Sequence, residues 1–260
     1  MTSAENAIIV ENLHKHFRIR YRTHLKTRML NLLKRQPPLQ EFTALHNVSF
    51  TVPRGQTVAV IGRNGSGKST LLCLLARVYR KTGGVIQMSA EDGSPARIAP
   101  LLDLSAGFHL DLTGAENILF YGAVLGNTAK EMRACFDSIV EFAELGSKVD
   151  THLRNWNEGA RLRLGFSIAV HTNPDILLVD EVLAVGDEAF QAKCYAYIRK
   201  MQSLGKTIVF VTHDLRTVER VAQRVIWLNQ GNIQMDGDVG EVLQSYRVFS
   251  AGAAFTDGLN

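Results

Sequence analysis

A glycine-rich segment of nine residues, 62–70, constrains the fold of this chain more than any other feature. The segment reads Gly62-Arg63-Asn64-Gly65-Ser66-Gly67-Lys68-Ser69-Thr70. The apolar run at 57–61 before it predicts a buried strand, and the pattern at 68–79 after it predicts a helix. A strand that turns through glycines directly into a helix is typical of α/β domains with a mainly parallel sheet.

Most of the chain continues this alternation of strand-like and helix-like periods. Further strands are predicted at 7–10, 48–52, 84–88, 97–101, 176–179 and 207–211, and a hairpin at 225–228 and 232–235. Further helices are predicted at 114–125, 128–145, 159–171, 187–204 and 215–222. Within 128–145 the apolar positions form one stripe, made of Met132, Phe136, Ile139, Val140 and Ala143. Because helices dominate 104–170 and interrupt the alternation, we expect an inserted helical subdomain there.

The length of 260 residues fits one or two domains, and the pattern predicts a single domain at 1–246. Between Asn12 and Gln40 the chain carries eight Lys or Arg residues and no acidic one, whereas its total charge is only +4. We therefore expect a basic insertion at 18–40, with an amphipathic helix that ends before two prolines. The small residues near the C-terminus predict a short flexible tail at 247–260.

Composition excludes several classes of protein. No apolar run approaches the roughly 18 residues that a membrane-spanning helix needs. The first 35 residues contain no apolar stretch followed by a small-residue cleavage site. The three cysteines, Cys73, Cys135 and Cys194, have neither the spacing of a metal site nor the number of a disulfide framework. We therefore expect a protein of a reduced, cytosolic compartment that does not cross a membrane by itself.

The glycine-rich segment matches the P-loop motif in the structural context that the motif requires. Its glycines let the backbone curl so that successive N–H groups and the helix N-terminus face a polyphosphate such as that of ATP. Lys68 is expected to reach the β- and γ-phosphates, and the Ser69 hydroxyl to bind Mg²⁺. A glycine turn that merely joins a strand to a helix does not require Lys and Ser at these positions.

Two further strand ends carry candidate catalytic residues. Asp180 and Glu181 follow the apolar run 176–179, and a carboxylate at the end of a buried strand beside the P-loop strand is placed to hold Mg²⁺. Glu181 is then expected to orient and activate water. His213 follows the run 207–211, at the edge of the sheet where ligands bind, so we expect its imidazole to touch the γ-phosphate. Each residue alone also fits an ordinary strand-end acid or cap; the combination favours the catalytic interpretation.

Together these residues resemble the nucleotide-binding subunit of an ABC transporter over roughly 8–246. Within that family the chain is most similar to the ATPases of exporters of lipid-linked O-antigen, capsule or teichoic acid chains. The segments that carry this likeness are 101–109 (LLDLSAGFH), 112–118 (LTGAENI) and 179–187 (VDEVLAVGD), together with the basic insertion. The resemblance implies a P-loop fold of the ABC type, with a mainly parallel core sheet, an antiparallel β subdomain and an inserted helical subdomain.

The resemblance also implies partners and a location. ABC ATPases dimerise head to tail, so that each ATP lies between one P-loop and the partner's signature motif. The chain would then be a peripheral homodimer at the cytoplasmic face of the inner membrane, bound to two copies of a transmembrane permease. The permease contact is expected around 108–113 and on the helical subdomain. The cargo would be a lipid-linked polysaccharide, and no nucleic acid is expected.

Further residues take roles only through the resemblance. Asp103 falls at the position of the Q-loop glutamine, where a carboxylate is able to bind Mg²⁺ or orient water. The segment 184–187 falls at the D-loop. Phe17 is the first candidate for the aromatic ring that stacks on adenine, and Tyr21 the second. An aromatic residue after a first strand equally fits a core position.

The signature motif departs from the family pattern. Trp156-Asn157-Glu158-Gly159-Ala160 stands where the family has Leu-Ser-Gly-Gly-Gln. Asn157 is expected to cap the following helix and to donate an amide hydrogen bond to a γ-phosphate, and Gly159 to allow close backbone approach. Glu158 would repel a triphosphate at about 4 Å by on the order of 1 to 4 kcal/mol, unless it points away or pairs with Arg161 or Arg163. We therefore expect slowed turnover.

The basic insertion has three interpretations. It is a solvated basic face, or it is attracted to anionic lipid headgroups at about 1 kcal/mol per Lys or Arg. In the third, it contacts the pyrophosphate of a lipid-linked substrate, since arginines suit bidentate phosphate contacts.

Three rival functions stay open at this point. A soluble ABC-type ATPase acting on nucleic acid would use the basic stretch for phosphate contacts. A P-loop kinase would need an acceptor pocket and a lid. A non-catalytic scaffold is suggested only by the altered signature motif.

Overall fold

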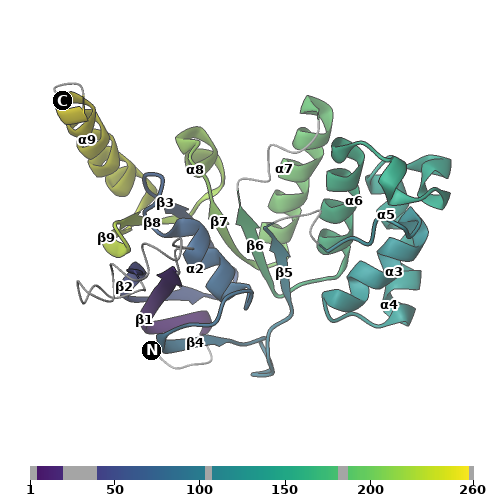
Figure 1. Ribbon diagram of the computed structural model, residues 1–260, viewed down its shortest axis with the longest axis horizontal. Coiled ribbons are helices and arrows are strands. Elements are labelled where there is room, and N and C mark those ends of the chain that lie inside the picture. Colours follow the sequence, from purple (N-terminus) through teal and green to yellow (C-terminus); the bar gives the residue numbers. More distant parts are fainter. Residues whose placement is uncertain (1–4, 20–39, 103–106, 181–186, 258–260) are drawn as a thin grey trace, which may run out of the picture.

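The computed structural model describes residues 5–19, 40–102, 107–180 and 187–257, and every structural statement below refers to these residues. Six strands form the main sheet, in the order β5-β6-β7-β3-β8-β9 (Figure 1). Their bounds are β3 Thr57–Ile61, β5 Ile98–Leu101, β6 Ile176–Asp180, β7 Thr207–Val211, β8 Arg224–Asn229 and β9 Asn232–Gly237. All neighbouring pairs are parallel except β8 and β9, which form the expected hairpin. The predicted α/β fold with a mainly parallel sheet is confirmed.

The strand order corrects one prediction about the site. Asp180 was expected to end a strand directly beside β3, but β7 lies between β3 and β6. In the register of the sheet, Val60 of β3 pairs with Val211 of β7, which in turn pairs with Asp180. Both β6 and β7 are short, apolar and buried, so their sequences do not reveal which of them is the neighbour of β3.

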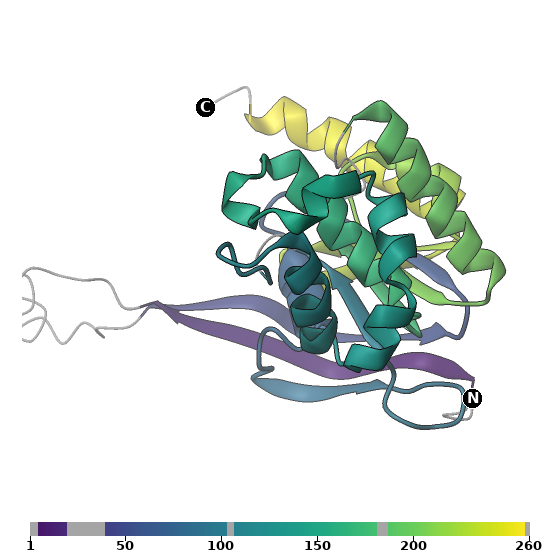
Figure 2. The same ribbon diagram turned by 90° about the vertical axis from the view of Figure 1, so that its right-hand side faces the viewer.

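A second sheet of three antiparallel strands, in the order β2-β1-β4, forms a separate layer (Figure 2). The bounds are β1 Asn6–Ile19, β2 Gln40–Pro53 and β4 Gly83–Met88. β1 and β2 are much longer than the predicted strands at 7–10 and 48–52, because pairing with each other supplies backbone hydrogen bonds to segments too polar to be recognised as strands. The predicted basic insertion at 18–40 lies largely at 20–39, outside the described residues, as does Tyr21. Arg18 belongs to β1 and forms an ion pair with Glu41 at 3.0 Å.

Apart from its edge strand β9, the main sheet is buried on both faces. Its strands alternate, so that Ala59 and Ile61 point into one apolar cluster while Val58 and Val60 point into the other. The first cluster is covered by α6 Glu158–His171, α7 Glu188–Ser203, α8 Leu215–Val221 and α9 Val239–Asp257. The second is covered by α2 Lys68–Leu75 and the antiparallel sheet. No helix among the described residues has the length and apolar character to cross a membrane.

A third apolar cluster belongs to the helices after β5. It is built by α3 Gly114–Val124, α4 Ala129–Ala134, α5 Phe136–Phe142, two 3₁₀ turns at Gly146–Asp150 and Leu153–Asn155, and part of α6. The predicted stripe supplies Met132, Ile139 and Ala143 to its interior. The predicted single helix at 128–145 is wrong, however, because the chain bends at Cys135 (φ −105°, ψ 5°), where neither Pro nor Gly marks the break.

Two helix ends also differ from prediction. The helix predicted at 68–79 ends at Leu75, and Arg77 adopts a left-handed φ of 60°. The tail predicted to be flexible at 247–260 is helical to Asp257, as part of α9. The Trp227 ring contacts Tyr246 and Phe249 of this helix, with centroids 5.5 and 5.0 Å apart, and the alanines that follow are strong helix formers.

Candidate functional site

The P-loop is fixed by close backbone contacts that only glycine permits. Gly62 has φ +151°, and a Cβ there would lie 2.2 Å from the carbonyl oxygen of Leu228. Gly67 has φ +104°, and a Cβ there would lie 2.7 Å from the carbonyl oxygen of Ala44. Both positions also have backbone angles that side chains rarely adopt. Carbonyl groups of the neighbouring strands β8 and β2 therefore leave space only for glycine at these two positions of the loop.

The loop leads into the N-terminus of α2, which has the features of an anion site. Gly67 is the N-cap and offers no side chain to the first N–H groups of the helix. The Lys68 side chain is 7% exposed, and its Nζ donates to the carbonyls of Gly62 at 2.8 Å and Arg63 at 3.1 Å. The ammonium thus lies over the curled backbone at the positive end of the helix, where a phosphate is stabilised.

Three hydroxyl side chains surround this loop. Ser66 is 3% exposed, and its Oγ has no hydrogen-bond partner among the described residues. Ser69 is exposed at the start of α2, and Thr70 is half-buried. A buried hydroxyl without a partner is uncommon in a folded protein, and it fits a loop that binds a polar ligand.

Asp180 and His213 lie at the same edge of the sheet as the P-loop. Asp180 ends β6, and Thr212 and His213 follow β7, the strand between β6 and β3. The helix α2 packs against β6, and the pKa of Cys73 on α2 is raised by burial and, to a smaller extent, by the negative charge of Asp180. The structure thus places Lys68, Ser69, Asp180 and His213 at one edge of the sheet.

His213 is held in an exposed turn by its neighbours. The Asp214 N–H donates to Thr212 Oγ1 at 3.0 Å, and the Asp214 side chain caps α8 by accepting from the Arg216 N–H at 3.0 Å. The pKa of Asp214 is lowered, chiefly by the hydrogen bond from the Thr217 hydroxyl. His213 itself is exposed in this turn, directly after β7.

Several predicted residues cannot be placed. Asp103, the predicted Q-loop residue, and Glu181, the predicted residue for water activation, lie outside the described residues, as does 184–186 of the predicted D-loop. Among the described residues no cluster of three His, Cys, Asp or Glu side chains is arranged to hold a metal ion. Ser69 and Asp180 offer a hydroxyl and a carboxylate oxygen, which are ligands of the type that Mg²⁺ prefers.

Phe17, the candidate for adenine stacking, lies in β1 opposite Phe42 of β2. Ala44, whose carbonyl limits the space at Gly67, lies two residues further along β2, so the register places Phe17 near the P-loop. The Phe17 ring contacts Tyr79 edge to face at 5.5 Å, and Lys15 Nζ lies 4.5 Å from its centroid. Phe17 is half-buried and is not a core residue.

The altered signature motif forms the N-terminus of α6, in a different part of the molecule from α2 (Figure 1). Asn157 caps this helix as predicted, with Oδ1 accepting from the Ala160 N–H at 2.9 Å. Trp156 is 3% exposed and donates from Nε1 to Thr151 Oγ1 at 2.8 Å. A Cβ at Gly159 would meet only Asn157 Oδ1, at 3.9 Å, so the described part of the chain does not itself demand glycine there.

The sequence left open that Glu158 pairs with Arg161 or Arg163. Within the described residues, neither arginine forms an ion pair with Glu158. Arg161 donates to the Trp156 carbonyl from Nη2 at 2.8 Å. Arg163 binds Glu144 at 2.8 Å and Asp187 at 2.5 Å. Glu158 is exposed in the first turn of α6, where the helix dipole favours a negative charge.

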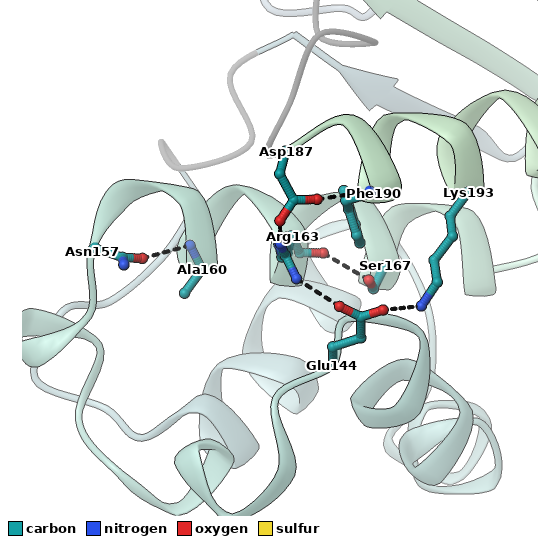
Figure 3. Close-up of polar contacts among 8 residues, drawn as sticks. All are labelled: Glu144, Asn157, Ala160, Arg163, Ser167, Asp187, Phe190 and Lys193. Carbon is teal, nitrogen blue, oxygen red and sulfur yellow. Dashed lines mark hydrogen bonds and ion pairs between the residues drawn. The ribbon is translucent and has the colours of Figure 1, made fainter.

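The sequence did not reveal the ion-pair network around Arg163 (Figure 3). Arg163 lies between Glu144 and Asp187, and Lys193 of α7 also binds Glu144. Glu144, Arg163 and Asp187 border a groove of about 520 Å³ that is also lined by residues 157–160. Glu144 and Asp187 are 19 and 24 residues from Arg163, so no local pattern indicates the pairing.

Comparison with known proteins finds ATP-binding proteins of the ABC transporter family. The ABC transporter family model matches residues 45–184. The O-antigen export system ATP-binding protein RfbB of Myxococcus xanthus is 43% identical over 254 residues, covering 95% of this chain and 57% of that protein. The RfbB protein of Klebsiella pneumoniae is 42% identical, covering 80% of this chain and 82% of its own. The teichoic acids export ATP-binding protein TagH of Listeria innocua is 40% identical, covering 81% of this chain and 61% of its own.

Solved structures support the fold. The dimeric post-hydrolysis state of an ATP-binding cassette bound to ADP and Pi matches with a TM-score of 0.68 at 22% identity, over 89% of this chain and 98% of that one. The ATP-binding subunit of another ABC transporter matches with a TM-score of 0.72 at 19% identity, over 92% and 93%. At these identities the likeness concerns the fold alone.

Proposed function

The chain belongs to the ABC transporter family of ATPases, and from this premise we propose that it powers export of a lipid-linked polysaccharide through a separate membrane-spanning permease. The observation that carries the catalytic part is the joint position of Lys68, Asp180 and His213 at one edge of the sheet. The cargo is inferred from relatives whose names describe O-antigen and teichoic acid export.

In the proposed site the P-loop N–H groups and Lys68 bind the phosphates of ATP. The position of Lys68 over the loop, at the N-terminus of α2, supports this role because it concentrates positive charge where phosphate charge develops. Glu181 orients the attacking water, and His213 stabilises charge at the γ-phosphate. Phe17 stacks on adenine. For this, the Lys15 ammonium, which lies 4.5 Å from the centroid of the Phe17 ring, must move away from that face of the ring.

Ser69 and Asp180 are the described residues proposed to hold Mg²⁺, with Asp103 as a further ligand. Mg²⁺ bound with ATP neutralises phosphate charge and orients the phosphate chain. Hydroxyl and carboxylate oxygens suit this ion, which usually keeps several waters and phosphate oxygens as its other ligands.

We further propose a head-to-tail homodimer in which Asn157 and Gly159 of one protomer face the ATP of its partner. The P-loop and the N-terminus of α6 lie in different parts of one chain, so a second copy is needed to bring the two motifs to one nucleotide. The open space at Gly159 supports this arrangement, because it leaves room for a ligand to approach the backbone.

The proposed permease contact is the exposed side of the helical region, at the cytoplasmic face of the inner membrane. Leu110, Phe120 and Val124 are 46%, 45% and 61% exposed. Exposed apolar side chains near one another are typical of protein interfaces. Two permease copies would match the two protomers. The basic insertion keeps its three interpretations, since it falls at 20–39.

The nucleic-acid alternative is disfavoured by the relatives, whose printed names describe export systems. A salt-sensitive affinity of the purified chain for DNA or RNA would revive it.

The export proposal is tested by deleting the gene and locating the lipid-linked glycan. We expect glycan to accumulate on the cytosolic side, and export to be restored by the wild-type chain but not by Lys68→Ala. Lys200→Ala, an exposed lysine in the last turn of α7 and outside the proposed permease contact, is the matched control and should restore export. Normal surface glycan in the deletion strain would contradict the proposal.

A further inference from the structure

Arg163, on α6, connects this helix to the end of α5 and to the start of α7. Its Nη1 donates to Glu144 Oε2 at 2.8 Å, just after α5, and its Nη2 donates to Asp187 Oδ2 at 2.5 Å, just before α7. The guanidinium also lies 5.0 Å from the centroid of Phe190. Its side chain is 20% exposed, whereas those of Glu144 and Asp187 are 47% and 62% exposed, so the ion pairs lie at the surface with the guanidinium as their more buried member. Figure 3 shows the two carboxylates on opposite sides of the guanidinium.

Asp187 has two tasks at once. Its Oδ1 caps α7 by accepting from the Phe190 N–H at 2.9 Å, while its Oδ2 binds Arg163. Its pKa is lowered, first by the hydrogen bond from Phe190 and then by the charge of Arg163. The start of α7 is thus tied directly to α6.

Glu144 occupies a position that favours glycine. It follows α5 with a left-handed φ of 56°, and its N–H donates to the Glu141 carbonyl at 3.1 Å, as at a helix C-terminus. A glutamate there adopts an unfavourable backbone conformation, yet its carboxylate binds both Arg163 and Lys193. The ion pairs therefore explain why a charged residue stands at this turn.

The network lies close to the proposed signature motif. Asn157 precedes Arg163 by six residues, which is about 9 Å along the helix axis. Glu144, Asp187 and Arg163 border the same groove as 157–160. In the sequence, Asp187 is only seven residues after Asp180, the end of β6.

We propose that Arg163 is a positioning residue for ATP hydrolysis, which holds the N-terminus of α6 and the start of α7 at a fixed separation by binding Glu144 and Asp187 together. This inference rests on the proposed role of Asn157 and Gly159 at the nucleotide. Arg163 does not touch the reacting atoms; it fixes the element that carries the motif. Because misplacement of about 1 Å is able to reduce a rate by about a hundredfold, the network affects kcat more than KM.

The test measures ATP turnover by the purified full-length chain with Mg²⁺. For Arg163→Gln we expect kcat to fall about tenfold or more while KM changes less than about twofold. Arg163→Lys should recover only part of the rate, because one ammonium does not reproduce the planar fork that binds two carboxylates. Asp187→Asn retains an N-cap but removes the charge, so it should lower kcat similarly, and the double variant should not be additive.

Arg97→Gln is the matched control, since Arg97 forms an exposed ion pair with Glu131 at 3.1 Å elsewhere on the surface. It should leave kcat unchanged. A folded Asp187→Asn with wild-type kcat would overturn the proposal, and so would an Arg163→Gln that only lowers the melting temperature. If the variants lose turnover as expected but glycan export does not require the chain, the export assignment fails and the positioning role stands.

Discussion

The P-loop is confined by backbone carbonyl groups of neighbouring strands, whereas the N-terminus of α6 is anchored by side-chain ion pairs with neighbouring segments. At Gly62 and Gly67, carbonyl groups of other strands leave no space for a Cβ. At Gly159 the space is open, and the helix below is anchored through the ion pairs of Arg163. The shape of the first region thus depends on backbone packing, while the second depends on charges contributed by separate segments. The difference indicates that the two regions respond to different substitutions.

The largest expected effect is on the P-loop. Lys68→Ala should lower ATP turnover by on the order of a hundredfold or more, because it removes the positive charge at the phosphates. Turnover is measured by phosphate release from the purified chain, with Lys130→Ala as the control. Wild-type turnover in Lys68→Ala would remove the P-loop from the mechanism.

Alanine substitutions of Gly62 in the P-loop and Gly159 in α6 should affect stability differently. Gly62→Ala should destabilise the fold by about 2 to 4 kcal/mol, because its Cβ would collide with the Leu228 carbonyl in a strained backbone conformation. Gly159→Ala should be neutral or stabilising by up to about 1 kcal/mol in urea unfolding, yet should lower turnover if a nucleotide approaches that backbone. Equal losses of unfolding free energy in the two variants would contradict the conclusion that backbone contacts confine Gly62 but not Gly159.

The cap at Asn157 gives a smaller effect. Asn157→Ala should cost about 1 kcal/mol in unfolding free energy through loss of the hydrogen bond to the Ala160 N–H, whereas Asn157→Ser should retain most of it. Combining Asn157→Ser with Glu158→Ser should raise ATP turnover, because the repulsion between Glu158 and the triphosphate disappears. If turnover and nucleotide-driven dimerisation stay unchanged, the altered motif has no effect.

The smallest effect is a pH dependence confined to the helical region. The pKa of Glu144 is lowered, first by the hydrogen bond from Lys193 and then by the charges of Lys193 and Arg163. A lowered pKa gives stability that is present above the ordinary value of 4.5 and is lost as the pH falls further. The difference in unfolding free energy between the wild type and Glu144→Gln should therefore shrink below about pH 4.5, as followed by urea titration. A constant difference down to pH 3 would show that the pairing contributes nothing to stability.

Prediction from sequence succeeded where the signal is local. The P-loop requires particular residues at consecutive positions, and the strands and helices on either side of it alternate with distinct periods, so the fold class and the edge that carries Lys68, Asp180 and His213 followed directly. The position of β7 between β3 and β6 did not follow, because both β6 and β7 are short apolar strands and their order depends on tertiary packing. The partners of Arg163 were missed for a similar reason, since they come from distant helices. The helical tail was missed because small residues suggest flexibility unless an aromatic contact such as that of Trp227 anchors them.

The chain has two tryptophans, and each lies beside one of the two regions. Trp156 precedes the Asn157 cap, and Trp227 precedes Leu228, whose carbonyl lies against Gly62. Both indole rings are nearly buried, at 3% and 8% exposure, so their emission should respond to small local rearrangements. Replacing one tryptophan at a time with Phe would thus give an intrinsic fluorescent probe for each region, without any added dye.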